Sequence, residues 1–145
     1  MFIRQVSIFL ENVKGSLREL TELLGKNDIN LLALCIADTS GFGIVRCIVK
    51  GEDVDRSVDI LRKNGYISKV NSVICIRVPH RPLGLSNVLN ILEQQDIAVE
   101  YAYSFCRSTL DDAVVIIRPS DKDKCLEILQ KNSINLVTQD ELDMF

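Results

Sequence analysis

Hydrophobic and polar positions in the first half of the chain follow two different periods. Residues 3–9 interleave β-branched apolar residues with polar ones, which predicts a strand. Leucines then recur at helical spacing over residues 17–24 and form one apolar stripe. Ser16 precedes this stripe and Glu19 follows three residues later. We therefore predict a helix with Ser16 as its N-cap in a capping box.

The rest of this half reads as three more strands and a second helix. Residues 29–37 are mostly apolar, which is typical of a buried strand, and two glycines within residues 38–43 predict a turn to an antiparallel partner. Acidic residues open the second helix, where the helix dipole favours them, and Gly65 ends it. The predicted elements are strands at 29–37, 44–49 and 66–70 and a helix at 53–63.

The second half of the chain repeats the first at an offset of 68 residues. Residues 60–64 (Ile-Leu-Arg-Lys-Asn) recur at 128–132 as Ile-Leu-Gln-Lys-Asn, and Asp28-Ile29 recurs as Asp96-Ile97. A repeat of this kind is sought first, because overlooking it misassigns the whole fold. The predicted elements are strands at 73–78, 97–105, 113–118 and 134–138, helices at 85–95 and 121–131, and a turn around 108–111.

Both halves therefore predict the order βαββαβ, an α+β fold of two ferredoxin-like units. In such a unit the four-stranded antiparallel sheet carries both helices on one face. We expect one domain at residues 1–70 and another at 71–145. Because a domain of about 70 residues buries little apolar surface alone, the two are expected to pack together as a pseudo-twofold pair.

Two segments of the first half resemble ACT domains, the small-ligand sensors attached to many enzymes of amino-acid metabolism. Residues 11–17 (Glu-Asn-Val-Lys-Gly-Ser-Leu) are similar to the acidic-x-x-Pro-Gly-x-Leu loop of that family, with Lys14 where proline is common. Residues 28–31 (Asp-Ile-Asn-Leu) look like the Gly-Ile-Asn-Ile start of its second strand. A tandem pair without a catalytic domain resembles the free-standing amino-acid-binding ACT proteins of bacteria.

The second half carries weaker versions of both segments. Residues 81–85 (Arg-Pro-Leu-Gly-Leu) are similar to the same loop with one residue, Leu83, inserted before the glycine, and residues 96–99 match the strand start without its asparagine. Because of this departure, the sequence gives no reason to expect equal ligand binding by the two copies.

The resemblance implies a non-catalytic site in which each loop faces the second strand of the other domain and buries an amino acid between them. In the first loop, Gly15 would let the ligand approach, and the free amides of Ser16, Leu17 and Arg18 would face its carboxylate. The implied ligand-binding residues are Glu11, Asn12, Val13, Lys14, Gly15, Ser16 and Leu17 opposite Val99, Tyr101 and Tyr103, and Arg81, Pro82, Leu83, Gly84 and Leu85 opposite Ile29, Asn30 and Leu31.

Each of these residues also has a purely structural interpretation. The loop glycines fit an ordinary strand-to-helix turn, and it is the repeat that favours a binding site over that reading. Tyr101 and Tyr103 share one face of their strand and could equally well pack on the sheet.

The remaining chemistry argues against an enzyme and against a metal site or cofactor. Five cysteines are widely spaced without a Cys-x-x-Cys pair, and the only histidine, His80, lies between two prolines. We expect the cysteines to be core residues and His80 to be an exposed loop residue. Asp111 and Asp112 fit a hairpin turn, and Ser40 and Ser104 have no base at a recognisable spacing.

Charge and hydropathy limit the partners. A net charge of −3 offers no positive field for nucleic acid, and the copies lack the pattern of aromatic and basic residues that RNA-binding sheets use. No apolar run is long enough to span a membrane, and the start of the chain does not read as a signal peptide, so we expect a cytoplasmic protein.

We therefore predict an amino-acid sensor that regulates a partner enzyme or pathway, as a homodimer or through its own domain pair. The alternative is an interaction or oligomerisation module that binds no ligand.

Overall fold

The computed structural model describes residues 1–39, 41–105 and 112–145, and these form two compact units. The N-terminal unit comprises Arg4–Asn71. The C-terminal unit comprises Ser72–Phe145 together with Met1–Ile3. Our expectations for Ser40, for Cys106 and for the turn at residues 108–111 lie outside the described residues.

The N-terminal unit has the strand order expected of a ferredoxin-like fold. Strands β1 and β3 pair antiparallel, with Val6 opposite Cys47 and Glu11 opposite Phe42, and β2 pairs with the other edge of β3. The start of β4 lies beside β1, which gives the order β4-β1-β3-β2. The elements are β1 (Ile3–Glu11), α1 (Ser16–Lys26), β2 (Ala33–Thr39), β3 (Phe42–Ile48), α2 (Asp53–Lys63) and β4 (Ile67–Pro79).

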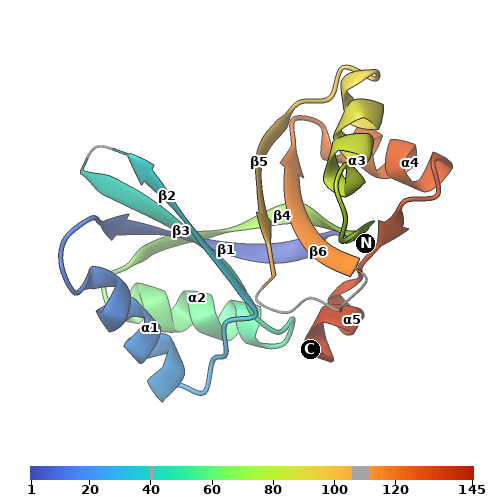
Figure 1. Ribbon diagram of the computed structural model, residues 1–145. Helices are drawn as coiled ribbons and strands as arrows, with labels where there is room; N and C mark the ends of the chain where they lie inside the picture. Colours follow the sequence, from blue (N-terminus) through green and yellow to red (C-terminus); the bar gives the residue numbers. More distant parts are fainter. Residues whose placement is uncertain (40, 106–111) are drawn as a thin grey trace. The chain divides into compact units, whose positions relative to one another are not determined.

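Helices α1 and α2 lie on the same side of this sheet (Figure 1) and close its core. Leu20 and Leu24 of α1 are buried, as are Val54 and Leu61 of α2. They pack against the alternate residues of β1 and β3 that point to the helices, Val6, Ile8, Leu10, Val45 and Cys47. The predicted amphipathic pattern is therefore confirmed for both helices.

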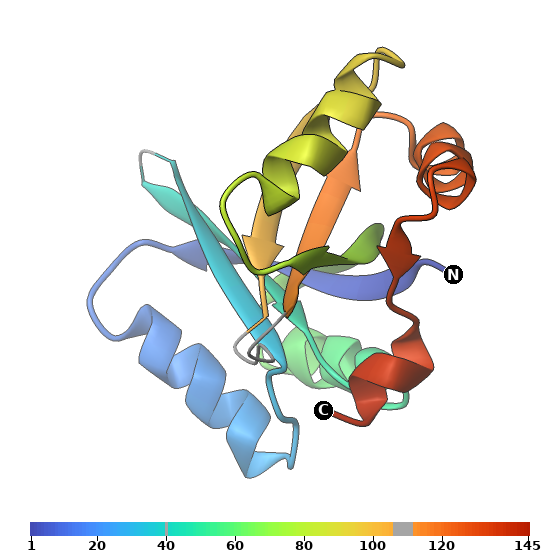
Figure 2. The same cartoon turned by 45° about the vertical axis from the view of Figure 1, so that its right-hand side comes forward.

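The C-terminal unit repeats this architecture. Its strand order is β7-β4-β6-β5, with Ile76 between Val115 of β6 and Leu136 of β7. Helices α3 and α4 cover one face (Figure 2), and Val88, Leu92, Cys125 and Leu129 join Ile74, Ile76, Val115 and Ile117 in the core. The further elements are α3 (Gly84–Glu93), β5 (Val99–Ser104), β6 (Asp112–Pro119), α4 (Lys122–Lys131), β7 (Asn135–Leu136) and α5 (Gln139–Asp143).

The first residues of the chain complete the C-terminal unit. Phe2 packs against its hydrophobic core, and the Lys122 Nζ lies 5.0 Å above the centre of the Phe2 ring. The Gln130 Nε2 donates to the Met1 Sδ at 3.8 Å. Domain boundaries drawn only from the repeat miss this contribution.

All four long helices end in the same motif, in which the backbone turns through a left-handed residue. These residues are Asp28, Gly65, Asp96 and Ser133. In each case the next amide donates to a carbonyl five residues back at 3.0 Å, from Ile29 to Leu24, Tyr66 to Leu61, Ile97 to Leu92 and Ile134 to Leu129. These are Schellman motifs, which satisfy the last carbonyls of a helix. The repeated sequence segments are thus largely helix C-termini.

Several predicted boundaries differ from the structure, and one element was not predicted. The strands predicted at 66–70 and 73–78 form one strand, β4, which crosses from one unit into the other. Strands β2 and β5 begin later than predicted, at Ala33 and Val99, because residues after each Schellman turn continue as a loop before pairing starts. The acidic tail forms a helix, α5, that the sequence pattern did not predict.

The cysteines that the structure describes are free thiols in or near the cores. Cys47, Cys75 and Cys125 are buried, and Cys35 is half-buried. Burial raises the pKa of Cys47 and of Cys75 to about 12 and that of Cys125 to about 11. Because thiolate is the reactive form, these buried thiols are inert at neutral pH.

Candidate ligand-binding loops and cleft

The first strand-to-helix loop forms a compact turn ahead of α1. The Val13 amide donates to the Glu11 carbonyl at 2.9 Å, and the Ser16 amide donates to the Val13 carbonyl at 3.2 Å. Gly15 has a φ of 91° and is itself the N-cap of α1, without a side-chain cap. Our prediction of Ser16 as the N-cap in a capping box was therefore wrong. Ser16 is instead the first helical residue.

The second loop reproduces these hydrogen bonds at the same offset of 68 residues. The Arg81 amide donates to the Pro79 carbonyl at 2.8 Å, and the Gly84 amide donates to the Arg81 carbonyl at 3.0 Å. The loops are therefore equally long, and our reading of Leu83 as an inserted residue was wrong. Leu83 takes the place of Gly15 with a φ of 69°, and Gly84 takes the place of Ser16.

The amides at the two helix starts are only partly free. We expected those of Ser16, Leu17 and Arg18 to face a ligand carboxylate, but the Ser16 amide is bonded to Val13. The equivalent Gly84 amide is bonded to Arg81. The following two amides of a helix have no partner within it, so they are the remaining donors at each start.

Side chains of the first loop are held mainly by their own unit. The Asn12 Nδ2 donates to the Asp38 Oδ1 at 2.9 Å, which ties the loop to the end of β2. Val13 and Lys14 are exposed, and Leu17 packs against the core. In the second loop Arg81 and Pro82 are exposed, and Leu85 packs against its core.

The predicted strand residues of the site have mixed surroundings. Ile29 is buried in the core of the N-terminal unit, Leu31 packs against that core, and Asn30 is exposed. Val99 packs against the core of the C-terminal unit. That each loop faces such a strand of the other unit remains a prediction.

Tyr101 and Tyr103 form a stacked pair on β5. Their ring centres lie 6.5 Å apart, with an angle of 28° between the planes. They stand opposite Arg118 and Ile116 of β6, after a register irregularity that follows Val99. Ile117 belongs to the core under α3 and α4. Successive residues of a strand point to opposite faces, so Ile116 and Arg118 face away from these helices, and the two tyrosines paired with them do the same.

A cleft of about 340 Å³ lies in the N-terminal unit where β1 ends, α1 begins and β4 starts. Its lining residues include apolar and aromatic ones, two with carboxylates and two with hydroxyls. The lining residues are Phe9, Leu10, Glu11, Ser16, Glu19, Phe42, Gly65, Tyr66 and Ile67.

Only two of these residues, Glu11 and Ser16, were among the predicted ligand contacts. Phe9 and Phe42 could have been predicted as surface residues, because each lies at a position of β1 or β3 whose neighbours in the strand are the buried ones. They are 43% and 58% exposed. A second cleft, of about 340 Å³, lies in the C-terminal unit beside α3. It is lined by Ser86, Leu89, Asn90, Glu93, Ile97 and Val99.

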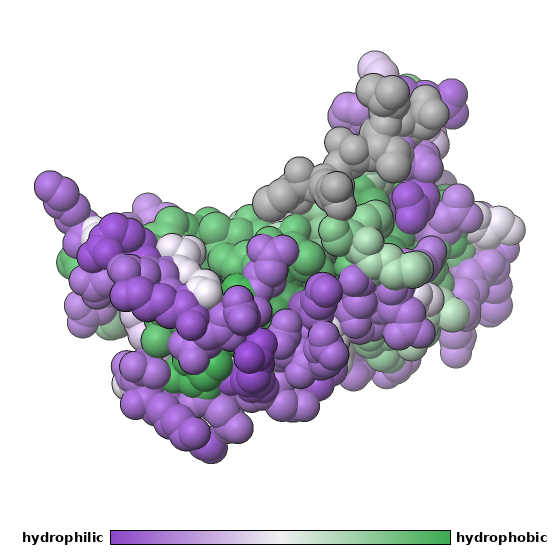
Figure 3. All heavy atoms as spheres, turned by 90° about the horizontal axis from the view of Figure 1, so that it is seen from below, coloured by the Kyte–Doolittle hydropathy of each residue, from purple (hydrophilic) through white to green (hydrophobic). Residues whose placement is uncertain are grey.

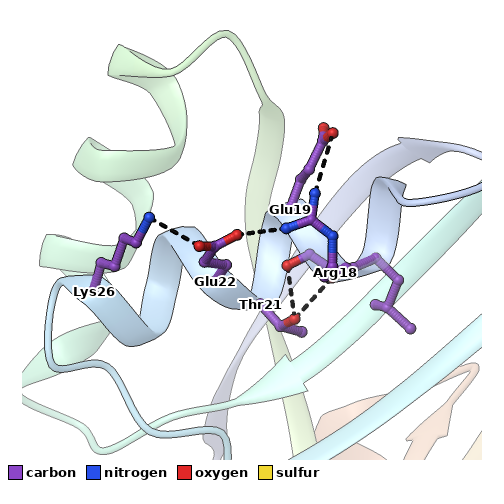
Figure 4. Close-up of polar contacts among 6 residues, drawn as sticks. Arg18, Glu19, Thr21, Glu22 and Lys26 are labelled. Carbon is purple, nitrogen blue, oxygen red and sulfur yellow. Dashed lines mark hydrogen bonds and ion pairs between the residues drawn. The ribbon is translucent and has the colours of Figure 1, made fainter.

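Charged side chains along α1 form a ladder that ends beside the first cleft. The Arg18 guanidinium donates to the Glu22 carboxylate at 2.6 Å and lies 3.8 Å from that of Glu19, and Lys26 contacts Glu22 at 2.9 Å (Figure 4). A hydrogen bond from Lys26 is the main reason that the pKa of Glu22 is lowered. Among the described residues, no ion pair involves the Glu11 carboxylate, whereas the Glu19 carboxylate lies 3.8 Å from the Arg18 guanidinium, so Glu11 is the unpaired acidic group of the cleft.

Over residues 1–39, 41–105 and 112–145, no group of three or more His, Cys, Asp and Glu side chains is placed to hold a metal ion. Within the same ranges no helix is long and apolar enough to cross a membrane.

A duplicated βαββαβ unit with matching strand-to-helix loops defines a tandem pair of small ferredoxin-like domains. The family model described as "ACT domain pair" matches residues 1–145, so this chain belongs to the ACT domain family. No curated protein sequence matches it.

Solved structures agree with this assignment. The chain is 39% identical to protein BT0572 from Bacteroides thetaiotaomicron, with a TM-score of 0.90 over 100% of this chain and 98% of that one. The regulatory subunit of aspartate kinase from Thermus thermophilus, in its ligand-free form, has a TM-score of 0.64 at 11% identity, covering 88% of this chain and 91% of that one. The latter likeness concerns the fold.

Proposed function

We propose that this ACT domain pair is a non-catalytic sensor that binds an amino acid at its strand-to-helix loops and regulates a partner enzyme or pathway. The observation that carries the proposal is the pair of loops with one hydrogen-bond pattern, each placing a left-handed residue directly before a helix start. A ligand carboxylate is favoured at such a start by the unpaired amides and by the helix dipole.

The likeness to the Thermus thermophilus subunit supports a regulatory role. That protein is the regulatory subunit of an aspartate kinase and shares the fold of this chain. Binding regulates a partner only if the ligand favours one arrangement of the protein over another. We therefore expect the bound ligand to favour one state of the protein over another.

The absence of catalysis is part of this proposal and has some chemical support. A nucleophilic cysteine needs a lowered pKa, whereas burial raises the pKa of Cys47, Cys75 and Cys125. We further propose that the protein acts in the cytoplasm, alone or as a homodimer, without nucleic acid or membrane as a partner.

A thermal-shift screen of the twenty amino acids on the full chain tests the proposal. A ligand at about 100 times its Kd stabilises a protein by roughly 2.7 kcal/mol, which is a shift of several degrees for a chain of this size. We expect at least one amino acid to raise the Tm, and calorimetry should confirm saturable binding.

A different observation favours the interaction module as the second candidate. Large apolar side chains reach the surface, among them Phe42, Ile67 and Leu83, which are 58%, 70% and 69% exposed. Figure 3 shows hydrophobic residues gathered at the surface between hydrophilic ones on the face that it draws. Such areas often mark binding surfaces for proteins. If no amino acid shifts the Tm, the sensor is excluded and this candidate takes its place.

A further inference from the structure

The two loops share a backbone path but differ in the space around it. A Cβ added at Gly15 would meet no atom within 4 Å, so the first loop is open at this point. The equivalent Leu83 carries a bulky side chain in the same left-handed conformation. A ligand that approaches the start of α3 therefore meets a leucine where the start of α1 presents bare backbone.

The residue after this position differs in a second way. A Cβ added at Gly84 would stand 2.2 Å from the Pro79 carbonyl oxygen, which means that the start of α3 packs directly on the end of β4. Its counterpart, Ser16, carries a side chain that lines the cleft beside β1. The first loop thus leaves room between strand end and helix start, and the second loop closes that room.

The lining of the first cleft defines which ligand it suits. Glu11 and Glu19 supply carboxylates, of which that of Glu19 also lies 3.8 Å from the Arg18 guanidinium, and Ser16 supplies a hydroxyl. Phe9, Phe42 and Ile67 supply apolar surface that is otherwise exposed to water. A pocket of about 340 Å³ is within the size range of small-molecule sites.

We propose that the cleft of the N-terminal unit, and not the cleft beside α3 in the C-terminal unit, binds an amino acid with an apolar side chain, whose ammonium group faces Glu11 and Glu19. This inference rests on the proposed function and adds to it the number of sites and the class of ligand. The ammonium supplies charge complementarity to the rim, and the side chain covers Phe9, Phe42 and Ile67. An acidic amino acid would bring a like charge to the two carboxylates and is disfavoured.

Isothermal titration calorimetry on the full chain tests these points with L-leucine, N-acetyl-L-leucine and L-aspartate as probes. We expect L-leucine to bind at one equivalent per chain. Acetylation removes the ammonium charge, so N-acetyl-L-leucine should bind at least tenfold more weakly. L-Aspartate should be at least as weak because of its added carboxylate.

Four variants locate the site. Glu11→Gln and Glu19→Gln should each weaken L-leucine binding about tenfold, because a charge-assisted hydrogen bond is lost. Glu93→Gln removes a carboxylate from the cleft beside α3, away from the proposed site, and is the control for loss of one acidic group, so the affinity of this variant should stay within twofold of the unaltered chain. Leu83→Gly should leave the stoichiometry at one.

The outcomes separate this inference from the proposed function. Two equivalents of L-leucine per chain, a preference for L-aspartate, or an equal effect of Glu11→Gln and Glu93→Gln would each overturn the inference while leaving an amino-acid sensor in place. Absence of binding by all twenty amino acids would overturn both.

Discussion

Leu83 and Gly15 occupy equivalent loop positions, yet only one of them suits its backbone. A left-handed conformation costs an L-residue about 1–2 kcal/mol, and glycine avoids most of this cost. Leu83 has a φ of 69° and a side chain that is 69% exposed, so little packing compensates for the strain. Strain of this kind is common at functional sites, which is consistent with the loop having a role beyond connecting β4 to α3.

We predict opposite effects for an exchange of these two residues. Leu83→Gly should stabilise the chain by about 0.5–1 kcal/mol, because relief of strain exceeds the added entropy of the unfolded glycine. Gly15→Leu should destabilise it by about 1–2 kcal/mol for the converse reason. Urea denaturation of each variant measures both. Destabilisation by Leu83→Gly would show that the leucine side chain makes contacts that outweigh its strain.

At the scale of elements, the repeated sequence segments lie mainly at the ends of the helices. The C-terminus of each of the four long helices uses a left-handed residue, and asparagine side chains at 27, 64 and 132 donate to the carbonyl four residues back. The helix N-termini differ more. Asp121 caps α4 by accepting from the Lys124 amide, whereas α1 and α3 have no side-chain cap.

The capping box of α5 makes a prediction about pH. The Thr138 amide donates to the Glu141 Oε2 at 2.7 Å, and this bond is the main reason that the pKa of Glu141 is lowered. A lowered carboxyl pKa in the folded state stabilises the fold above the ordinary pKa of that group and loses this effect as pH falls through the folded value. The advantage of the unaltered chain over Glu141→Gln should therefore be present at pH 7 and be lost as the pH falls below the ordinary glutamate pKa and through the lower folded pKa of Glu141.

Urea denaturation at pH 7 and at pH 3.5 checks this prediction, with Thr138 variants as the reference. Thr138→Ala should cost about 1 kcal/mol at pH 7, and Thr138→Ser should retain most of the cap. A pH-independent difference between the unaltered chain and Glu141→Gln would show that the carboxylate charge contributes nothing to this helix end.

At the scale of the whole molecule, the chain begins and ends in the same unit. Phe2 packs on the core of the C-terminal unit beneath the Lys122 ammonium, although the whole of the other unit, Arg4–Asn71, lies between it and the rest of that core in the sequence. Residues of the C-terminal unit are therefore not all neighbours in the sequence. Its core includes an aromatic side chain, Phe2, from the start of the chain.

We predict that Phe2→Ala destabilises the C-terminal unit selectively. The side chain is half-buried, so the loss should be about 1–2 kcal/mol, below the roughly 3–5 kcal/mol of a fully buried phenylalanine. Lys122→Met, which removes only the cation, should cost no more than about 1 kcal/mol. Amide hydrogen exchange locates the effect, and we expect faster exchange in α4 and β7 than in the unaltered chain. Equal acceleration in α2 would contradict the assignment of Phe2.

The sequence allowed the α+β fold and the order of elements to be predicted, because apolar periodicity records which face of each element is buried. The buried positions of α2 and α4 and the core cysteines at 47, 75 and 125 follow that pattern. The ACT family was predictable for a related reason. A loop that turns from strand to helix needs particular residue types at particular positions, and these can be recognised in a single sequence.

Only the tertiary structure decided how the loops compare and which residues surround the cleft. When the two loop sequences are aligned by Gly15 and Gly84, Leu83 appears to be an inserted residue. The hydrogen bonds of the loops instead align Leu83 with Gly15. Phe9, Tyr66 and Ile67 meet at one cleft because β1 and β4 are neighbours in the sheet, although they are far apart in the chain. Local propensity sets elements within a few residues, but proximity across a sheet depends on long-range pairing, and the linear pattern does not record it.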